Sequence, residues 1–181
     1  MFRASTTLTD PQRRQFLRGD LRGKNLPHRP PWAVPEAEFT VRCTRCDDCI
    51  RACEPGILHR GSGGFPEVRF EESGCDFCGD CLAACEPGAL SAPVPAPSLA
   101  WRWKARIEAN CLSQRGIVCR SCGDACAEEA IRFQLEVGGR ATPLLDAKAC
   151  NGCGECLAVC PEGAVRLTIP NPETGSYEEH P

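Results

Sequence analysis

The stretch CTRCDDCIRAC, residues 43–53, sets the pattern from which the rest of the chain can be read. Its cysteines are separated by two, two and three residues, a run written C-x2-C-x2-C-x3-C. The run recurs as CDFCGDCLAAC at residues 75–85 and as CNGCGECLAVC at residues 150–160. A further copy, CLSQRGIVCRSCGDAC at residues 111–126, has seven residues between its first two cysteines. The chain is therefore built on a fourfold internal repeat, which is stronger evidence of architecture than local propensity.

The four copies use all sixteen cysteines of this chain of 181 residues. The similarity continues beyond the last cysteine of each copy, as CEPGIL, CEPGAL, CAEEAI and CPEGAV. Only seven Phe, three Trp and one Tyr are available to build an apolar core. A core of that size needs additional stabilisation in a small fold, and bonds made through the cysteines are the obvious source.

This cysteine spacing is typical of cubane iron-sulfur clusters. Three thiolates at every third residue let one tight loop reach three irons, and in two-cluster ferredoxins the fourth cysteine of a run binds the other cluster. Cys111 completes the third set because no other cysteine remains. The rule predicts four [4Fe-4S] clusters with crossed ligand sets: Cys43, Cys46, Cys49 with Cys85; Cys75, Cys78, Cys81 with Cys53; Cys111, Cys119, Cys122 with Cys160; and Cys150, Cys153, Cys156 with Cys126.

Two other uses of the cysteines are weighed against clusters. A non-redox module with four-cysteine zinc sites remains an alternative, although zinc modules usually show separated C-x2-C pairs rather than triplets. Disulfides require an oxidising compartment. RRQFLR, residues 13–18, is similar to a twin-arginine export signal, but a polar stretch follows it where an apolar one is needed. No segment reaches the roughly 20 apolar residues of a membrane span, and we therefore expect a cytoplasmic protein.

Charge and motifs exclude other functions. The net charge of −3 and the pI of 5.7 argue against nucleic-acid binding, which needs a basic face. Each bound cluster adds about −2 to that charge, so a partner should present basic surface. No catalytic residues are expected, because the sequence shows no nucleophile paired with a base and no dinucleotide-binding or Walker motif. We expect an electron carrier or cluster-handling protein rather than an enzyme.

The repeats pair into two halves, each with a predicted hairpin between its runs. The first hairpin turns at GSGG and the second at GG, residues 61–64 and 138–139. The predicted fold class is α+β, with two tandem bacterial-type 2[4Fe-4S] ferredoxin units, a short helix over each x3 step and a closing strand at residues 164–169. The predicted parts are an N-terminal extension with a short basic helix (1–40), the first unit (41–92), a linker (93–104), the second unit (105–169) and a flexible tail (170–181).

Two further groups of side chains carry expectations. Carboxylates within the cysteine runs, Glu155 among them, are expected to be solvated. The three tryptophans are expected to cover the clusters and the linker, because solvent access to a cluster affects its potential. They are Trp32, Trp101 and Trp103.

Several segments between residues 13 and 166 together resemble one family. They are RRQFLRG, RPPW, CTRCDDCIRAC, RGSGGFPEVRF, CDFCGDCLAAC, CLSQRGIVCRSCGDAC followed by EEAIRF, and CNGCGECLAVCP. The sequence is similar to the NapF family, ferredoxin-type accessory proteins of the periplasmic nitrate reductase system. The resemblance implies a cytoplasmic protein with four [4Fe-4S] clusters.

The same resemblance implies a partner, the precursor form of the catalytic molybdenum subunit of periplasmic nitrate reductase. The chain would mature that subunit or supply it with electrons taken from a redox donor. The alternative from another class is an electron-transfer iron-sulfur subunit of a membrane-linked, quinol-dependent oxidoreductase.

Overall fold

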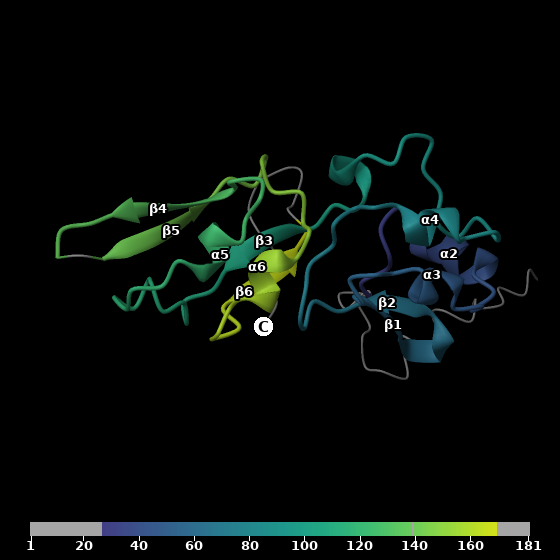
Figure 1. The fold of residues 1–181 in the computed structure, drawn as a ribbon, viewed down its shortest axis with the longest axis horizontal. Helices are drawn as coiled ribbons and strands as arrows, with labels where there is room; N and C mark the ends of the chain where they lie inside the picture. The colour runs from purple at the N-terminus through teal and green to yellow at the C-terminus, as the bar shows by residue number, and fades with distance from the viewer. Residues whose placement is uncertain (1–26, 139, 170–181) are drawn as a thin grey trace, which may run out of the picture.

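The computed structural model describes residues 27–138 and 140–169, which form two bodies side by side along the long axis (Figure 1). The predicted helix near the N-terminus and the predicted tail lie outside the described residues. The first body contains α2 (Glu36–Arg42), α3 (Asp48–Arg51), β1 (Leu58–Arg60), η1 (Ser62–Gly64), β2 (Pro66–Val68) and α4 (Asp80–Ala83). The second, which follows η2 (Pro97–Leu99), contains β3 (Lys104–Ile107), α5 (Ser121–Asp124), β4 (Ile131–Leu135), β5 (Ala141–Leu145), α6 (Glu155–Ala158) and β6 (Val165–Thr168).

One four-residue helix is present at the predicted place in each cysteine run, beginning just before the third cysteine and including the first two residues of the x3 step. Three of these helices follow a residue in the left-handed region: Asp47 at φ 65°, Gly79 at φ 85° and Gly154 at φ 87°. Glycine adopts this conformation without the steric cost that a Cβ brings, so it suits the turn between the second and third cysteine. The helix α5 instead follows Arg120 at φ −133°.

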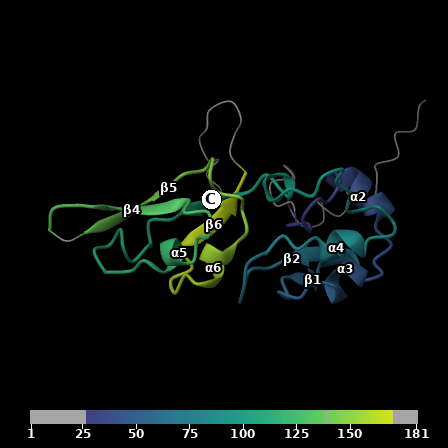
Figure 2. The same ribbon diagram turned by 45° about the horizontal axis from the view of Figure 1, so that its top comes forward.

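Antiparallel pairing holds each unit together in two places. The predicted hairpins are present, with β1 paired to β2 and β4 paired to β5. The predicted closing strand is also present as β6, and its partner is β3, which the sequence did not reveal. In the first unit the equivalent pairing is the single bridge between Ala33 and Leu90. The β4–β5 hairpin extends away from the first unit in both views (Figures 1 and 2).

The two apolar cores differ in size. In the first core Phe39 is fully buried, with its ring 6.2 Å from that of Phe65, and Trp32 is 3% exposed. Within the described residues, the buried members of the second core are smaller, Ala105, Ala130, Ile131 and Val165 together with cysteines. The domain bounds remain a proposal. Because Pro30, Trp32 and Phe39 are buried in the first core, we propose that the first unit begins near Pro30 rather than at residue 41. The short hairpin alone leaves this core uncovered, and α2 closes it.

In the described part of the chain, no helix combines the length and hydropathy needed to cross a membrane.

Candidate iron-sulfur centres

Four cavities are each lined by four cysteines. We number them in the order of the cysteine runs. In every case three cysteines come from one run and the fourth comes from the other run of the same unit, so the structure brings together the sets derived from spacing. Site 1 has Cys43, Cys46, Cys49 and Cys85; site 2 has Cys53, Cys75, Cys78 and Cys81; site 3 has Cys111, Cys119, Cys122 and Cys160; site 4 has Cys126, Cys150, Cys153 and Cys156.

The crossing follows from the turn that comes after each short helix. The chain leaves the helix at the fourth cysteine and turns through a bond from the N–H three residues later, as from Gly56 to the Cys53 carbonyl at 3.1 Å. The same turn joins Gly163 to Cys160 at 3.2 Å and Glu129 to Cys126 at 3.0 Å. Because α3 contacts α4 and α5 contacts α6, each fourth cysteine lies beside the partner run.

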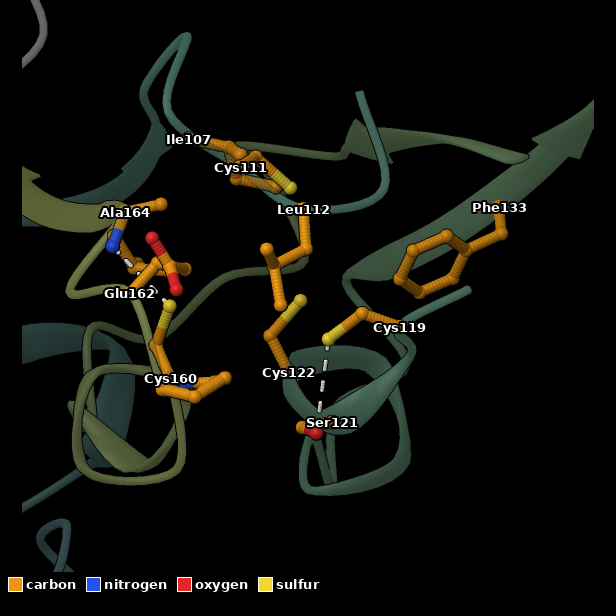
Figure 3. Close-up of a pocket in the computed structure, with 12 residues that line it drawn as sticks. Ile107, Cys111, Leu112, Cys119, Ser121, Cys122, Phe133, Cys160, Glu162 and Ala164 are labelled. Atoms are coloured by element: carbon orange, nitrogen blue, oxygen red, sulfur yellow. Dashed lines mark hydrogen bonds between the residues drawn. The ribbon is translucent and has the colours of Figure 1, made fainter. Parts of the chain in front are cut away.

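Site 3 shows how separate segments supply one set of thiols (Figure 3). Cys111 follows β3, Cys119 and Cys122 flank the start of α5, and Cys160 follows α6. The segment between Cys111 and Cys119 is held to β5, because the Ser113 hydroxyl donates to the Ala141 carbonyl. Cys111 is therefore a buried member of this set despite its distance in sequence.

Burial makes the free thiols weak acids. Burial, together with a smaller contribution from neighbouring sulfurs, raises the pKa of Cys49 to about 11 and that of Cys81 to about 12. For the same reasons the pKa of Cys122 is raised to about 11, and the pKa of Cys156 is raised strongly. Four thiolates can therefore share one cavity only around a cationic centre, since burial and mutual repulsion both favour the neutral form.

Backbone N–H groups donate to several of these sulfurs. The donors lie at 3.1 to 3.5 Å, and such bonds stabilise thiolates and tune cluster potentials. The pairs are Phe77 to Cys75, Leu90 to Cys85, Ala105 to Cys150 and Ala164 to Cys160.

The donor set fits a cluster better than a single ion. Among residues 27–138 and 140–169, no three Cys, His, Asp or Glu side chains converge as the ligands of one metal ion would. Four thiols that stand apart around a cavity are what a cubane requires, because each binds a different iron. An all-sulfur set suits iron-sulfur clusters as well as zinc, so the separation of the thiols, not their chemistry, favours a cluster.

Glu155 and Trp101 join the units through contacts for which the sequence gives no signal. Glu155 is not freely solvated, because its Oε2 accepts from the Gly74 N–H at 2.6 Å. Trp101 stacks on Trp103 with 4.8 Å between ring centroids, and its Nε1 donates to the Asn151 carbonyl at 3.1 Å. No local pattern could have identified these contacts, because each links segments at least 50 residues apart.

The RPPW segment has a structural role. The Arg29 guanidinium forms two bonds with the Glu36 carboxylate, at 2.7 and 2.8 Å. It also lies 4.9 Å from the centre of the Phe39 ring and 5.3 Å from that of Phe65. Arg29 thus fixes the start of α2 over the first core.

Comparison with known proteins agrees with this geometry. The 4Fe-4S dicluster domain family matches residues 42–89 and 116–164, one match per unit. The second match begins after Cys111, so the assignment of that cysteine to site 3 rests on the cysteine count and on its place in the cavity.

Similar proteins of known name cover nearly the whole chain. "Ferredoxin-type protein NapF" of Haemophilus influenzae is 44% identical over 89% of this chain and 96% of its own length. The NapF of Escherichia coli K12 is 42% identical over 86% of this chain and 93% of its own. "Ferredoxin-type protein NapG" of the same strain is 31% identical over 73% of this chain and 65% of its own. By its two dicluster regions and its similarity along most of its length, the chain belongs to the NapF family of ferredoxin-type iron-sulfur proteins.

Proposed function

We propose that this chain is an electron carrier with four [4Fe-4S] clusters that serves a periplasmic nitrate reductase, acting in the cytoplasm on the precursor of the catalytic molybdenum subunit. The set of four cavities, each lined by four cysteines in the crossed arrangement, carries the electron-carrier part of the proposal, and the similarity to the NapF proteins supports the rest. Bound clusters supply reversible one-electron transfer. The protein holds them, shields them and presents them to partners.

The exposed side of site 2 indicates what kind of surface a partner should offer. Cys78 is exposed, and the carboxylates of Asp76 and Asp80 are exposed on either side of it. Cys46 of site 1 is exposed as well. Acidic groups beside an accessible site steer a basic partner toward it and increase the rate of encounter. We therefore propose that the first unit meets the redox partner through a basic patch of that partner.

The cluster content is tested by anaerobic purification. We expect about four irons and four sulfides for each site, hence about sixteen of each per chain, with broad brown absorbance. Colourless protein that contains zinc instead would refute the iron-sulfur function and support the zinc-binding alternative.

The partner is tested by capture from anaerobic cytoplasm. A tagged chain with its clusters intact should retain the nitrate reductase precursor, while the charge-reversal variant Asp76→Lys/Asp80→Lys, with full iron content, should retain much less. Failure of the wild-type chain to retain the precursor would contradict this partner. Recovery of the chain from the periplasm would favour the alternative, an electron-transfer subunit of a membrane-linked oxidoreductase.

A further inference from the structure

The two units meet at the cysteine loops of sites 2 and 4. The Cys75 N–H donates to the Cys153 carbonyl at 2.8 Å, and the Gly74 N–H next to it donates to Glu155 Oε2 at 2.6 Å. Cys75 lines site 2 and Cys153 lines site 4. A single backbone hydrogen bond therefore connects the two loops. We call Gly74, Cys75, Cys153 and Glu155 the junction.

The close approach requires glycine on both sides. A Cβ on Gly74 would lie 2.7 Å from the Glu155 nitrogen and 3.0 Å from the Cys153 carbonyl oxygen. On the other side, a Cβ on Gly154 would lie 2.3 Å from Phe70. Gly74 is buried and its φ is not positive, so space rather than backbone conformation demands a glycine there.

Aromatic rings surround the junction. The Trp101 ring lies 6.0 Å from Phe70 and 5.8 Å from Phe77, and Phe77 is itself within the site 2 loop between Cys75 and Cys78. Trp101 also donates to Asn151, in the site 4 loop. These ring contacts link the two loops and restrict their movement relative to each other.

The junction sets the order of the sites along the molecule. Within the units, α3 contacts α4 and α5 contacts α6, so site 1 adjoins site 2 and site 3 adjoins site 4. Figures 1 and 2 both place α6 nearer than α5 to the first unit. The spatial order is therefore 1, 2, 4, 3, which differs from the order of the cysteine runs in the sequence.

We propose that the junction is the electron-transfer contact between the two units and that Glu155 is the positioning residue that holds it. This inference rests on the proposed function, because it requires clusters in sites 2 and 4. An external reductant first gives one electron to one of the two units. The electron then passes across the junction between sites 2 and 4, so the donor cluster is oxidised by one electron and the acceptor cluster is reduced by one electron. No bond is broken and no proton is transferred in this step.

The test compares Glu155→Ala and Gly74→Ala with the control Asp48→Ala. Asp48 precedes the third cysteine of its run as Glu155 does, but its carboxylate pairs with Arg51 of its own helix. Glu155→Ala and Asp48→Ala each remove a carboxylate contact beside one site, Gly74→Ala adds a Cβ for which the junction has no room, and only Asp48→Ala leaves the junction unaltered. Glu155→Gln keeps an acceptor oxygen and serves as the conservative variant. All are prepared anaerobically and compared at the iron content of the wild type.

Two readouts report on the junction. Hydrogen exchange should become about tenfold faster at the Cys75 amide in Glu155→Ala and Gly74→Ala, because the bond to Cys153 opens more often. The electron paramagnetic resonance spectrum of the dithionite-reduced protein should lose the part of its spin interaction that arises between the units. Asp48→Ala should match the wild type in both, and Glu155→Gln should lie close to it.

Unchanged exchange and an unchanged spectrum in Glu155→Ala and Gly74→Ala would overturn the proposal. Its failure is distinguishable from that of the proposed function. A chain with full iron content and a coupled junction that does not bind the precursor contradicts the partner only. An iron-loaded chain that binds the precursor with no coupling between units contradicts the junction only.

Discussion

Replacing Cys111 by alanine gives the sharpest test of the four sites, because Cys111 is the proposed ligand that the dicluster family match leaves out. We expect the variant to lose the cluster of site 3 while sites 1 and 2 keep theirs. Iron per chain should fall from about 16 to about 12, or to about 15 where a three-iron cluster persists in site 3. The thiol of Cys111 is buried beside Cys122, so a water molecule has little access to replace it.

The structure predicts which part of the chain loses stability in this variant. Cys111 lies four residues after the end of β3, and Cys160 lies five residues before the start of β6. A cluster in site 3 therefore ties together the two strands of one sheet, beside the 2.7 Å bond from the Glu108 N–H to the Ala164 carbonyl. Binding energy of a metal centre acts as folding energy. Hydrogen exchange should thus accelerate in the second unit and remain unchanged in the first.

The assay is iron and sulfide per chain, with Ser113→Ala as the matched control. Ser113 is 2% exposed and lies in the same segment. Its loss should cost about 1 to 3 kcal/mol of unfolding free energy, because the Ala141 carbonyl loses its partner. All four thiols remain, so iron should stay near the wild-type value. If Cys111→Ala retains full iron and an unchanged resonance spectrum, Cys111 is not a ligand and site 3 is wrongly assigned.

Three further predictions concern packing, backbone and thiol chemistry. Phe39→Ala should destabilise the first unit by about 3 to 5 kcal/mol because its ring is fully buried, measured as the urea concentration at which cluster absorbance is lost; a change below about 1 kcal/mol would contradict this packing. Glu129→Gly should stabilise the second unit by about 0.5 to 1 kcal/mol, because Glu129 has φ 49° where the other runs place glycine; equal urea midpoints for variant and wild type would argue against strain there. In the iron-free chain, alkylation of Cys81 should rise about tenfold per pH unit from pH 7 through pH 9, because burial raises its pKa to about 12 and only the thiolate reacts; a plateau at pH 9 would mean that the thiol is solvated.

Sequence spacing, with the rule that the fourth cysteine of a run binds the other cluster, predicts the crossed cysteine sets, and each set lies around one cavity of the structure. That these cysteines bind clusters stays a prediction. The spacing also predicts the short helices, since three residues between cysteines leave room for one turn. Both hairpins can be predicted from the Gly-rich sequences at residues 61–64 and 138–139. Each of these features depends on residues close together in the chain.

The features that sequence reasoning missed depend on distant residues. The strand β3 is four residues long and has no alternation that marks it, and it pairs with β6, which is distant in the sequence. Phe39 is buried because Phe65 and Arg29 come to it from other segments. Glu155 and the exposed Asp80 each lie between a glycine and the third cysteine of their run. They differ because Glu155 accepts a hydrogen bond from Gly74 of the first unit, which the run itself does not encode. A carboxylate within a cysteine run therefore has no fixed role that the run itself encodes.

The two units differ most in the segment that leads into their first closely spaced cysteines, and this difference affects how each unit is stabilised. In the first unit α2 lies between Ala33 and Cys43, and it contributes the fully buried Phe39. The second unit has no helix between β3 and Cys111, and the segment that follows leaves Val118 88% exposed. Within the described residues, its buried side chains are thus smaller than those of the first unit. Because apolar burial contributes less free energy there, the second unit depends more on the groups bound at its cysteines than the first unit does.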